Sequence, residues 1–399
     1  MKRAIYKLVL KWKSLSLPFK ILIILVFLLI MSGSAYFLTS YLLNKDDTMG
    51  LVRSNLNKEV ELIAPSPIPP RFSPINGIQI SAENYDELMS RHPVSVVINN
   101  HKEARPQSGL SFADIVLEVL AEGGITRYVA VYHSNYDVEK IGPVRSLRYY
   151  MIDFAGGFDD SIILHHGWAG HDGASFEVYN EKSDARGAIS RFGVKNIQTD
   201  ASTYRDPVKV RTAGSVHALY TDFSRIRAEI DRLGKASNWK LGATGAESPL
   251  FKDEALFEDR GEFGAVNIKF MSLGGRDYEP RFTYDRLTNT YPRFIGGNPD
   301  VDTLTEKQIA PKNVAIEWHN YADARDGHNR IVIEMIGEDK VTILRDGEVI
   351  EGVWKKECRT CRTKYFDELG NEIPLNRGQL WVVNAVKVQD RLISTIVIE

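Results

Sequence analysis

The residues of this chain that could bind a ligand gather between Pro93 and Arg148. Arginine can hold a carboxylate or phosphate through two parallel N–H groups, and the amides of asparagine and glutamine suit sugar hydroxyls or peptide groups. Each polar cluster adjoins an apolar run of strand character, and side chains leaving buried strands converge where the backbone turns out of the core. We therefore expect one ligand site. Its candidate residues are Asn99, Asn100, Arg105, Gln107, Glu122, Thr126, Arg127, Arg145, Ser146 and Arg148.

The segment 142–146, Gly-Pro-Val-Arg-Ser, gives the strongest physical argument. Its last residue, a serine, can cap a helix, because the apolar residues that follow it have helical spacing. The free N–H groups and positive dipole end of a helix start favour an anion, and Arg145 and Arg148 could add a bidentate clamp. The alternative is that these arginines pair with carboxylates of the domain itself, such as Glu118 or Glu122.

Two neighbouring clusters extend this region. Residues 122–127 read Glu-Gly-Gly-Ile-Thr-Arg and join two strand-like runs, and the flanking Glu and Arg could face one cleft. A hairpin turn with a surface ion pair is the alternative. Asn99 and Asn100 end the first strand and residues 105–108 continue its loop, although asparagine is also common as a plain turn residue.

The histidines and cysteines indicate no metal or cofactor site. His165 and His166 are adjacent in a strand, so they point to opposite faces and at most one can join a given site. A third ligand would have to come from a remote histidine. Trp168 could instead stack on a sugar ring. Cys358 and Cys361 are expected to form a local disulfide that staples a hairpin turn.

No motif identifies a reaction. The sequence contains no serine in a nucleophile elbow, no phosphate-binding glycine-rich loop and no carboxylate pair that announces glycoside hydrolysis. Carboxylates that meet only in the folded protein would escape such a search. Whether the protein is an enzyme is therefore left open.

The spacing of apolar residues predicts two folded regions. Region 75–240 mixes short β-branched or aromatic runs with helical segments and is predicted to be an α+β, mixed α/β domain. In region 241–399 turn signals recur between apolar runs, which predicts a mainly antiparallel β domain built from hairpins. The expected strands are 94–98, 115–120, 128–132, 161–164, 266–270, 314–318, 331–336, 341–344 and 380–383, and helices are expected after Ser146 and Thr221.

The N-terminal segment is predicted to anchor the chain in a membrane. Residues 1–20 carry six basic residues and no acid, and the uncharged apolar run 21–43 is long enough to cross the roughly 30 Å hydrocarbon layer as one helix. The positive-inside bias keeps the N-terminus cytoplasmic and places the bulk of the chain outside. A signal peptide cleaved near Gly33-Ser34-Ala35 is the alternative. Residues 44–74 are predicted to be a proline-rich extracytoplasmic linker.

The part of the chain outside the membrane is acidic. Subtracting the six basic residues of 1–20 from the 50 Lys and Arg leaves 44, against 52 Asp and Glu, a net charge of −8. Such a body is a poor general binder of nucleic acid or anionic wall polymer, so no nucleic-acid partner is expected. Any anion site must be a local arginine cluster.

From about residue 74 to 399 the chain resembles the YerB-like family of bacterial envelope proteins, whose two halves are domains of unknown function (DUF3048). The motifs that carry the resemblance are 104–110, 113–116, 122–127 and 142–146 in the first half, and 284–285, 291–293, 313–314, 352–356 and 378–381 in the second. The resemblance implies an envelope location and no established reaction. Many family members are lipoproteins, whereas this chain has an apolar segment instead.

Two further positions depart from the family pattern. Val216-His-Ala-Leu-Tyr220 stands where the family has a segment like Pro-His-Asn-Leu-Tyr, so this chain lacks the Asn of that segment. Cys358 and Cys361 are not part of the pattern, which argues against a shared function for them.

The leading hypothesis is a membrane-anchored, extracytoplasmic protein of the bacterial cell envelope that binds a cell-wall or phosphorylated small-molecule ligand. Arg105, Arg127 and Arg145 would hold its anionic group. Asn99, Asn100 and Gln107 would fix its orientation. The alternatives are a cell-wall transferase or hydrolase, and a non-catalytic scaffold of an envelope complex. The sequence leaves the oligomeric state open.

Overall fold

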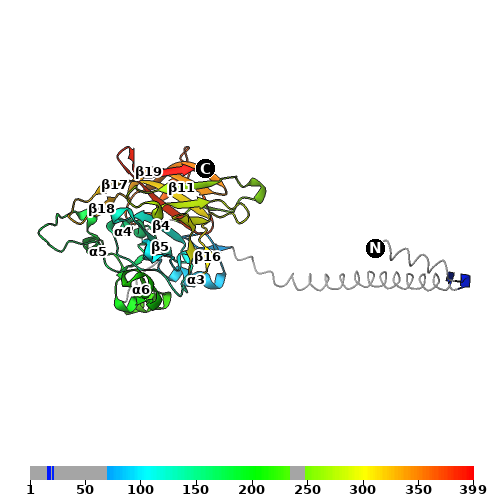
Figure 1. The fold of residues 1–399 in the computed structure, drawn as a ribbon, viewed down its shortest axis with the longest axis horizontal. Coiled ribbons are helices and arrows are strands. Elements are labelled where there is room, and N and C mark those ends of the chain that lie inside the picture. Colours follow the sequence, from blue (N-terminus) through cyan, green and yellow to red (C-terminus); the bar gives the residue numbers. More distant parts are fainter. Residues whose placement is uncertain (1–15, 19, 22–69, 234–247) are drawn as a thin grey trace, which may run out of the picture. The chain divides into compact units, whose positions relative to one another are not determined.

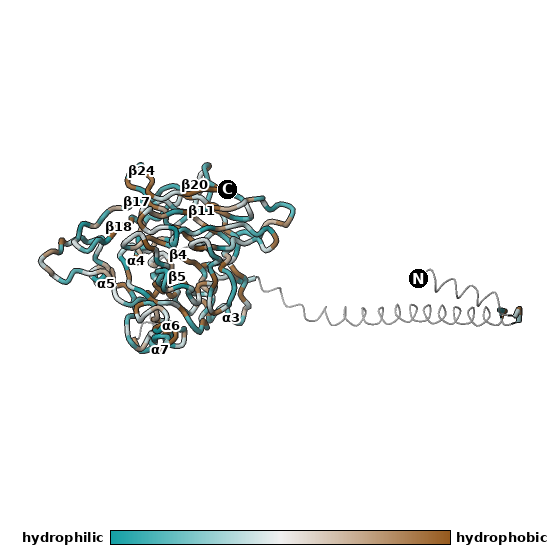
Figure 2. Tube along the Cα trace, viewed as in Figure 1, coloured by the Kyte–Doolittle hydropathy of each residue, from teal (hydrophilic) through white to brown (hydrophobic). Residues whose placement is uncertain are grey.

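The computed structural model describes residues 16–18, 20–21, 70–233 and 248–399, and Pro70–Glu399 form one compact unit. The predicted membrane segment 21–43, apart from Ile21, and most of the predicted linker 44–74 lie outside the described residues. Within the described ranges, no helix combines the length and the apolar character needed to cross a bilayer. Hydrophobic and hydrophilic residues are interspersed along the tube of Figure 2.

A mixed sheet of twelve strands forms the centre of this unit (Figure 1). Its order is β21-β20-β19-β17-β23-β4-β5-β3-β6-β7, with β18 beside β17 and β24 beside β23. The strands are β3 Val94–Asn99, β4 Ile115–Leu120, β5 Thr126–Tyr132, β6 Ile162–Leu164, β7 Asn196–Ile197, β17 Asn313–Asp323, β18 Ile331–Ile333, β19 Gly337–Arg345, β20 Glu348–Lys356, β21 Lys364–Phe366, β23 Leu380–Val388 and β24 Arg391–Leu392.

The pairing of β23 with β4 makes this sheet continuous across the two predicted regions. The two strands are parallel, with Leu380 opposite Ile115 and Val383 opposite Glu118. All residues of β3, β4 and β5 are buried, as expected for strands covered on both faces. Regions 75–240 and 241–399 therefore share one sheet, although each has the element types that its sequence pattern predicts.

A second sheet of five strands is antiparallel throughout, in the order β14-β13-β12-β11-β25. Its strands are β11 Ala265–Lys269, β12 Pro280–Thr283, β13 Arg293–Ile295, β14 Asn298–Pro299 and β25 Thr395–Ile398. Phe282 of β12 contacts Trp381 of β23 edge to face, with ring centroids 6.3 Å apart, so the two sheets share a core. Four short pairs complete the β structure: β1 Arg71–Phe72 with β2 Gln79–Ile80, β8 Tyr204–Arg205 with β9 Leu219–Tyr220, β10 Phe251–Lys252 with β22 Leu375–Asn376, and β15 Val301–Asp302 with β16 Lys307–Gln308.

The helices of this unit are α3 Ala82–Ser90, α4 Tyr149–Gly156, α5 Ala185–Phe192, α6 Pro207–Ala213 and α7 Phe223–Arg232. The helix expected after Thr221 is present as α7, where the Asp222 side chain accepts the N–H of Arg225. The prediction that Ser146 caps the helix that follows it is wrong. Arg148 is the N-cap of α4, because the Leu147 N–H donates to Gly167 O at 3.0 Å and holds this segment extended.

A fully buried ion pair joins the two sheets. Arg293 of β13 donates from Nη2 to both carboxylate oxygens of Glu118 in β4, at 2.8 and 2.9 Å, and both side chains have no solvent exposure. Arg293 also pairs with Asp300 and lies 4.7 Å from the centroid of the Trp381 ring. Burial alone would lower the pKa of Arg293, but the charge of Glu118 raises it overall, so the guanidinium stays charged.

We expect Glu118→Gln to lower the free energy of unfolding by about 3–5 kcal/mol, because it leaves a buried arginine without its main counter-charge. Urea unfolding of the full-length protein in detergent, followed by tryptophan fluorescence, measures the loss. The matched control is Glu338→Gln, which removes an exposed partner of Lys355 and is expected to change stability by less than about 1 kcal/mol. Equal losses in the two variants would contradict the role given to the buried pair.

Candidate functional site

The segment 142–147 enters the sheet where β3 and β6 separate. Parallel β6 accompanies β3 only as far as Val96. Beyond that point Arg145 donates its backbone N–H to Val97 O, and Asn99 donates to Pro143 O, both at 2.8 Å. On its other side the segment accepts the N–H of His166 at Arg145 O, 3.1 Å away. The segment thus lies at the carboxyl ends of two parallel strands, the usual place for a ligand in such sheets.

Two of the predicted arginines are paired with Glu122. Arg148 donates to both oxygens of this carboxylate, with Nη2 to Oε2 at 2.7 Å, and Arg127 Nη2 lies 3.6 Å from Oε2. Arg127 also donates from Nη1 to Ser146 O at 2.7 Å. Burial alone would raise the pKa of Glu122, but the hydrogen bonds and charge of Arg148 lower it overall. The sequence left open whether Arg148 binds a ligand anion or pairs with a carboxylate of the domain itself. The structure shows that it pairs with such a carboxylate.

Arg145 differs from its neighbours. Its side chain is half-buried, and within residues 70–233 and 248–399 its guanidinium has neither an ion pair nor a hydrogen bond. Partial burial and the charge of Arg148 lower the pKa of Arg145. Burial also lowers the pKa of Arg127, to about 10. Glu122 therefore pairs with Arg127 and Arg148 but not with nearby Arg145, and the charge that this carboxylate leaves uncompensated favours an anion.

Two histidines stack beside Asn99. The rings of His101 and His217 are nearly parallel, at 19°, with centroids 4.6 Å apart. Asn99 Oδ1 accepts the N–H of His101 at 2.9 Å, so its amide nitrogen faces His217 Nδ1 at 3.0 Å and donates to it. His101 Nδ1 accepts the N–H of Glu103 at 3.3 Å. Both neutral rings therefore carry their proton on Nε2.

The charge state of this histidine pair follows from its surroundings. Partial burial is the largest cause that lowers the pKa of His101 and of His217 below 6.5, and the positive charge of Arg145 lowers both further. At neutral pH the rings are therefore uncharged Nε2–H donors. An anion bound at Arg145 would favour their protonation.

Four other predicted site residues belong to an internal network. Asn100 Nδ2 donates to Thr126 Oγ1 at 2.6 Å, and its Oδ1 accepts Arg105 Nε at 2.9 Å and Gln107 Nε2 at 3.2 Å. Thr126 in turn donates to Glu118 at 3.3 Å. These hydrogen bonds connect the four side chains to one another and to Glu118, although Gln107 Oε1 is buried without a hydrogen-bond partner among the described residues. The network supports the loop that carries Asn99.

Ser146 and the turn 166–168 lie next to Arg145, whose backbone oxygen accepts the N–H of His166. Gly167 has φ of +77°, and a Cβ at this position would lie 3.0 Å from Ser146 Oγ, so the turn needs glycine for this approach. Trp168 next to it is partly exposed, as a stacking surface requires. His165 is internal: it pairs with Gly167 O at 2.8 Å, and burial lowers its pKa to about 4. In the described ranges no group of three His, Cys, Asp or Glu side chains is arranged to hold a metal ion.

The structure therefore places five of the predicted site residues at the segment 142–147: Asn99, Arg127, Arg145, Ser146 and Arg148. The sequence argument missed His101 and His217 as members of this cluster. They are far apart in the chain and meet only because the short β9 strand, next to His217, runs beside the segment 141–144. The feature of the sequence that could have indicated this cluster is His101, which directly follows the two asparagines at the end of the first strand.

Known proteins resemble this chain over most of its length. The family described as "Protein of unknown function (DUF3048) N-terminal domain" matches residues 81–236, and its C-terminal counterpart matches residues 267–382. The chain is 32% identical over 316 residues to the Bacillus subtilis (strain 168) protein named "Putative lipoprotein YerB", covering 78% of this chain and 85% of that protein.

A solved structure agrees with this relationship. The crystal structure of the YerB protein from Bacillus subtilis matches with a TM-score of 0.66 at 26% identity, covering 82% of this chain and 99% of that one. Both sequence domains and the fold are therefore shared. This chain belongs to the YerB-like family of DUF3048 proteins and carries both of its domains in order.

Proposed function

We propose that this protein is a membrane-associated protein of the bacterial cell envelope that binds an anionic, glycan-type ligand outside the cytoplasm. The observation that carries the proposal is Arg145, a half-buried guanidinium at the carboxyl edge of the sheet with no partner among the described residues. A partly desolvated cation without a counter-charge is costly unless a ligand supplies one.

The proposed location rests on the sequence and on the relative. The matched Bacillus subtilis protein is named "Putative lipoprotein YerB", and lipoproteins are attached to membranes. This chain has basic residues followed by the apolar run 21–43, which would serve the same purpose as a signal anchor. Residues 44–399 would then lie outside the cytoplasm.

The ligand chemistry follows from the groups around Arg145. A guanidinium binds a phosphate or carboxylate bidentately, and the Nε2–H groups of His101 and His217 add neutral donors. Trp168 in the neighbouring turn 166–168 is partly exposed and could offer an aromatic face to a sugar ring. A phosphorylated or carboxylated sugar therefore fits the site better than a simple anion does.

A cell-wall transferase or hydrolase is the second candidate, and one observation favours it. Asn99 holds His217 with Nδ1 as acceptor, which leaves Nε2 as the only ring position for exchange with a substrate. Turnover of a glycan substrate that is lost in His217→Gln and kept in Arg145→Gln would favour catalysis over binding. A scaffold would tolerate both substitutions.

We expect N-acetylglucosamine 6-phosphate to bind the full-length protein in detergent with saturable heat in calorimetry. Arg145→Gln should weaken this binding about tenfold to a hundredfold, because it removes a charge-assisted hydrogen-bonding pair. Unphosphorylated N-acetylglucosamine should bind much more weakly to the wild type and should not respond to Arg145→Gln.

The control for this substitution is Arg281→Gln, which removes a partly exposed arginine of β12 that pairs with Glu399. It should leave the affinity unchanged within about twofold. The anion-site proposal fails if the two variants bind alike, or if the wild type does not bind the phosphorylated sugar. Equal binding of both sugars would make the site a glycan site without an anion requirement.

We also expect the affinity for sulfate, whose charge is constant over this range, to rise about fivefold from pH 7.5 to about pH 5. The reason is that His101 and His217 have pKa values below 6.5 and gain a positive charge beside the anion as the pH falls. Lys102, Arg105, Arg145 and Lys209 oppose this protonation, a charge on His101 opposes that of His217, and Glu103 favours it. The double variant His101→Gln, His217→Gln should show no such rise, and an unchanged rise would rule out these histidines as its source.

A further inference from the structure

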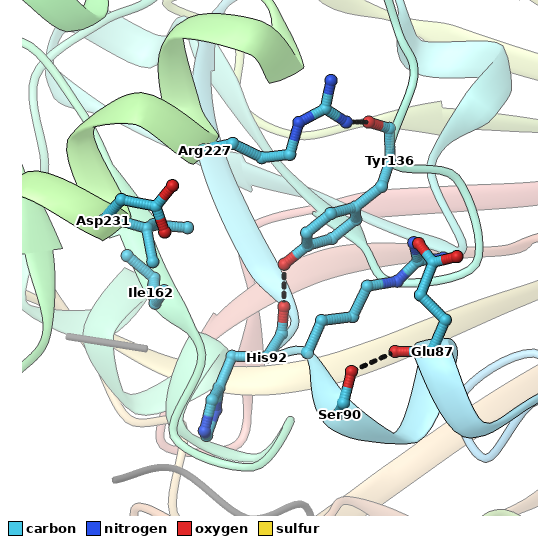
Figure 3. Close-up of a pocket in the computed structure, with 9 residues that line it drawn as sticks. Glu87, Ser90, His92, Tyr136, Ile162, Arg227 and Asp231 are labelled. Atoms are coloured by element: carbon cyan, nitrogen blue, oxygen red, sulfur yellow. Dashed lines mark hydrogen bonds and ion pairs between the residues drawn. The ribbon is translucent and has the colours of Figure 1, made fainter. Parts of the chain in front are cut away.

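A separate cavity of about 250 Å³ lies near the opposite end of β3. It is bounded by the last turns of α3 and α7, the loop after β5 and the start of β6. Figure 3 shows Asp231 and Ile162 on one side, Tyr136 and Glu87 on the other, and Arg227 between them. His92 precedes β3 and Asn99 ends it, so the cavity is roughly 20 Å from the Arg145 cluster along the strand.

The two arginines of this cavity differ in how many of their donor groups are used within the protein. Arg91 is committed within the protein: it donates to Glu87 at 3.1 Å and to two backbone carbonyls, and its guanidinium covers the Tyr136 ring at 4.3 Å. Among the residues that the structure describes, Arg227 donates from Nη1 to Tyr136 O and, at 2.9 Å, to Asp137. Within the described ranges its Nη2 and Nε groups have no acceptor and can serve a ligand.

Asp231 provides the opposite charge one helical turn from Arg227. Both lie on α7, and the two side chains form no ion pair with each other. Among the residues that the structure describes, the Asp231 carboxylate has no ion pair or hydrogen bond. Residues four apart on a helix have Cβ atoms about 5–6 Å apart. A cationic and an anionic group on neighbouring atoms of one ligand could therefore meet both side chains.

The helix ends strengthen the position for a cation. α7 ends at Arg232 and α3 ends at Ser90, so the negative ends of two helix dipoles face the cavity near Asp231 and Glu87. Asp231 in the last turn of α7 is unfavourable for the helix by itself. A bound ammonium group would offset the unfavourable interaction between the Asp231 carboxylate and the negative end of the helix dipole.

The remaining walls are apolar or uncharged. Tyr136, Ile162 and Ile230 are buried and line the cavity. Burial lowers the pKa of His92 to about 3, so this ring adds no charge. The volume is below the roughly 300–1,000 Å³ of pockets for drug-sized ligands, which suits a smaller molecule with an apolar side chain.

We propose that this cavity binds a free α-amino acid with an apolar side chain. Its carboxylate would pair with Arg227, its ammonium group with Asp231, and its side chain would contact Tyr136, Ile162 and Ile230. The amino and carboxylate groups of such a molecule are attached to one carbon, which matches two opposite charges one helical turn apart. This site is independent of the Arg145 site and of the function proposed there.

Isothermal titration of the full-length protein in detergent with L-leucine tests the proposal. Two analogues lack one charge each: 4-methylpentanoate has no ammonium group and 3-methylbutylamine has no carboxylate. We expect saturable binding of L-leucine, and binding of each analogue that is about tenfold weaker or more.

The variants separate the two charges. Asp231→Asn should weaken L-leucine about tenfold and leave 4-methylpentanoate unchanged, whereas Arg227→Gln should weaken L-leucine and leave 3-methylbutylamine unchanged. The matched control is Arg225→Gln, which removes an arginine of α7 that pairs with Asp222 at 3.0 Å and does not line the cavity. Absence of saturable leucine binding, equal binding of the analogues, or equal effects of Arg227→Gln and Arg225→Gln would each overturn the proposal.

Discussion

The buried pair of Glu118 and Arg293 is the constraint on which the arrangement of the two sheets depends. Neither charge could enter the core alone, because the cost of removing it from water exceeds what packing returns. The pair forms only when β4 of the large sheet faces β13 of the small one. We infer that it selects this one sheet-on-sheet arrangement from the many that apolar side chains alone would allow.

The same carboxylate also connects the core to the candidate site. Glu118 accepts hydrogen bonds from Thr126 and Trp381, and Thr126 accepts one from Asn100. Asn100 then fixes the loop that begins beside Asn99 and the histidine pair. This chain of buried hydrogen bonds holds the loop beside Arg145 in place, so the core of the protein positions the surroundings of the candidate site.

The sequence predicted local features well and long-range ones poorly. The expected strands are present because a strand is indicated by the apolar character of consecutive residues, as in 94–98 and 115–120. The parallel pairing of β4 with β23 was not predictable, since many apolar strands could have satisfied it. Ser146 was expected to cap a helix, but a hydrogen bond from the next residue to Gly167 keeps this segment extended.

The arginines illustrate the same limit at the site. Arg127, Arg145 and Arg148 look alike in the sequence, and all three lie at one edge of the sheet. The reach of a single carboxylate, Glu122, decides which of them are paired and which one is left over. Likewise His101 and His217 became neighbours through chain topology, and Arg227 and Asp231 became a charged wall only because α7 ends beside α3.

The continuous sheet has a consequence for how the protein is made. β4 is complete early in the chain, but Ile115 pairs with Leu380, close to the C-terminus. Contacts of such high sequence separation form slowly, because a long loop must close before they bring any stabilisation. If the part of the chain that follows the predicted anchor is exported in sequence order, its first half must wait with an open apolar strand edge until nearly all of the chain has emerged. An unpaired edge of this kind is prone to join another chain, so the interval between the start and the end of export is the period of greatest exposure to aggregation.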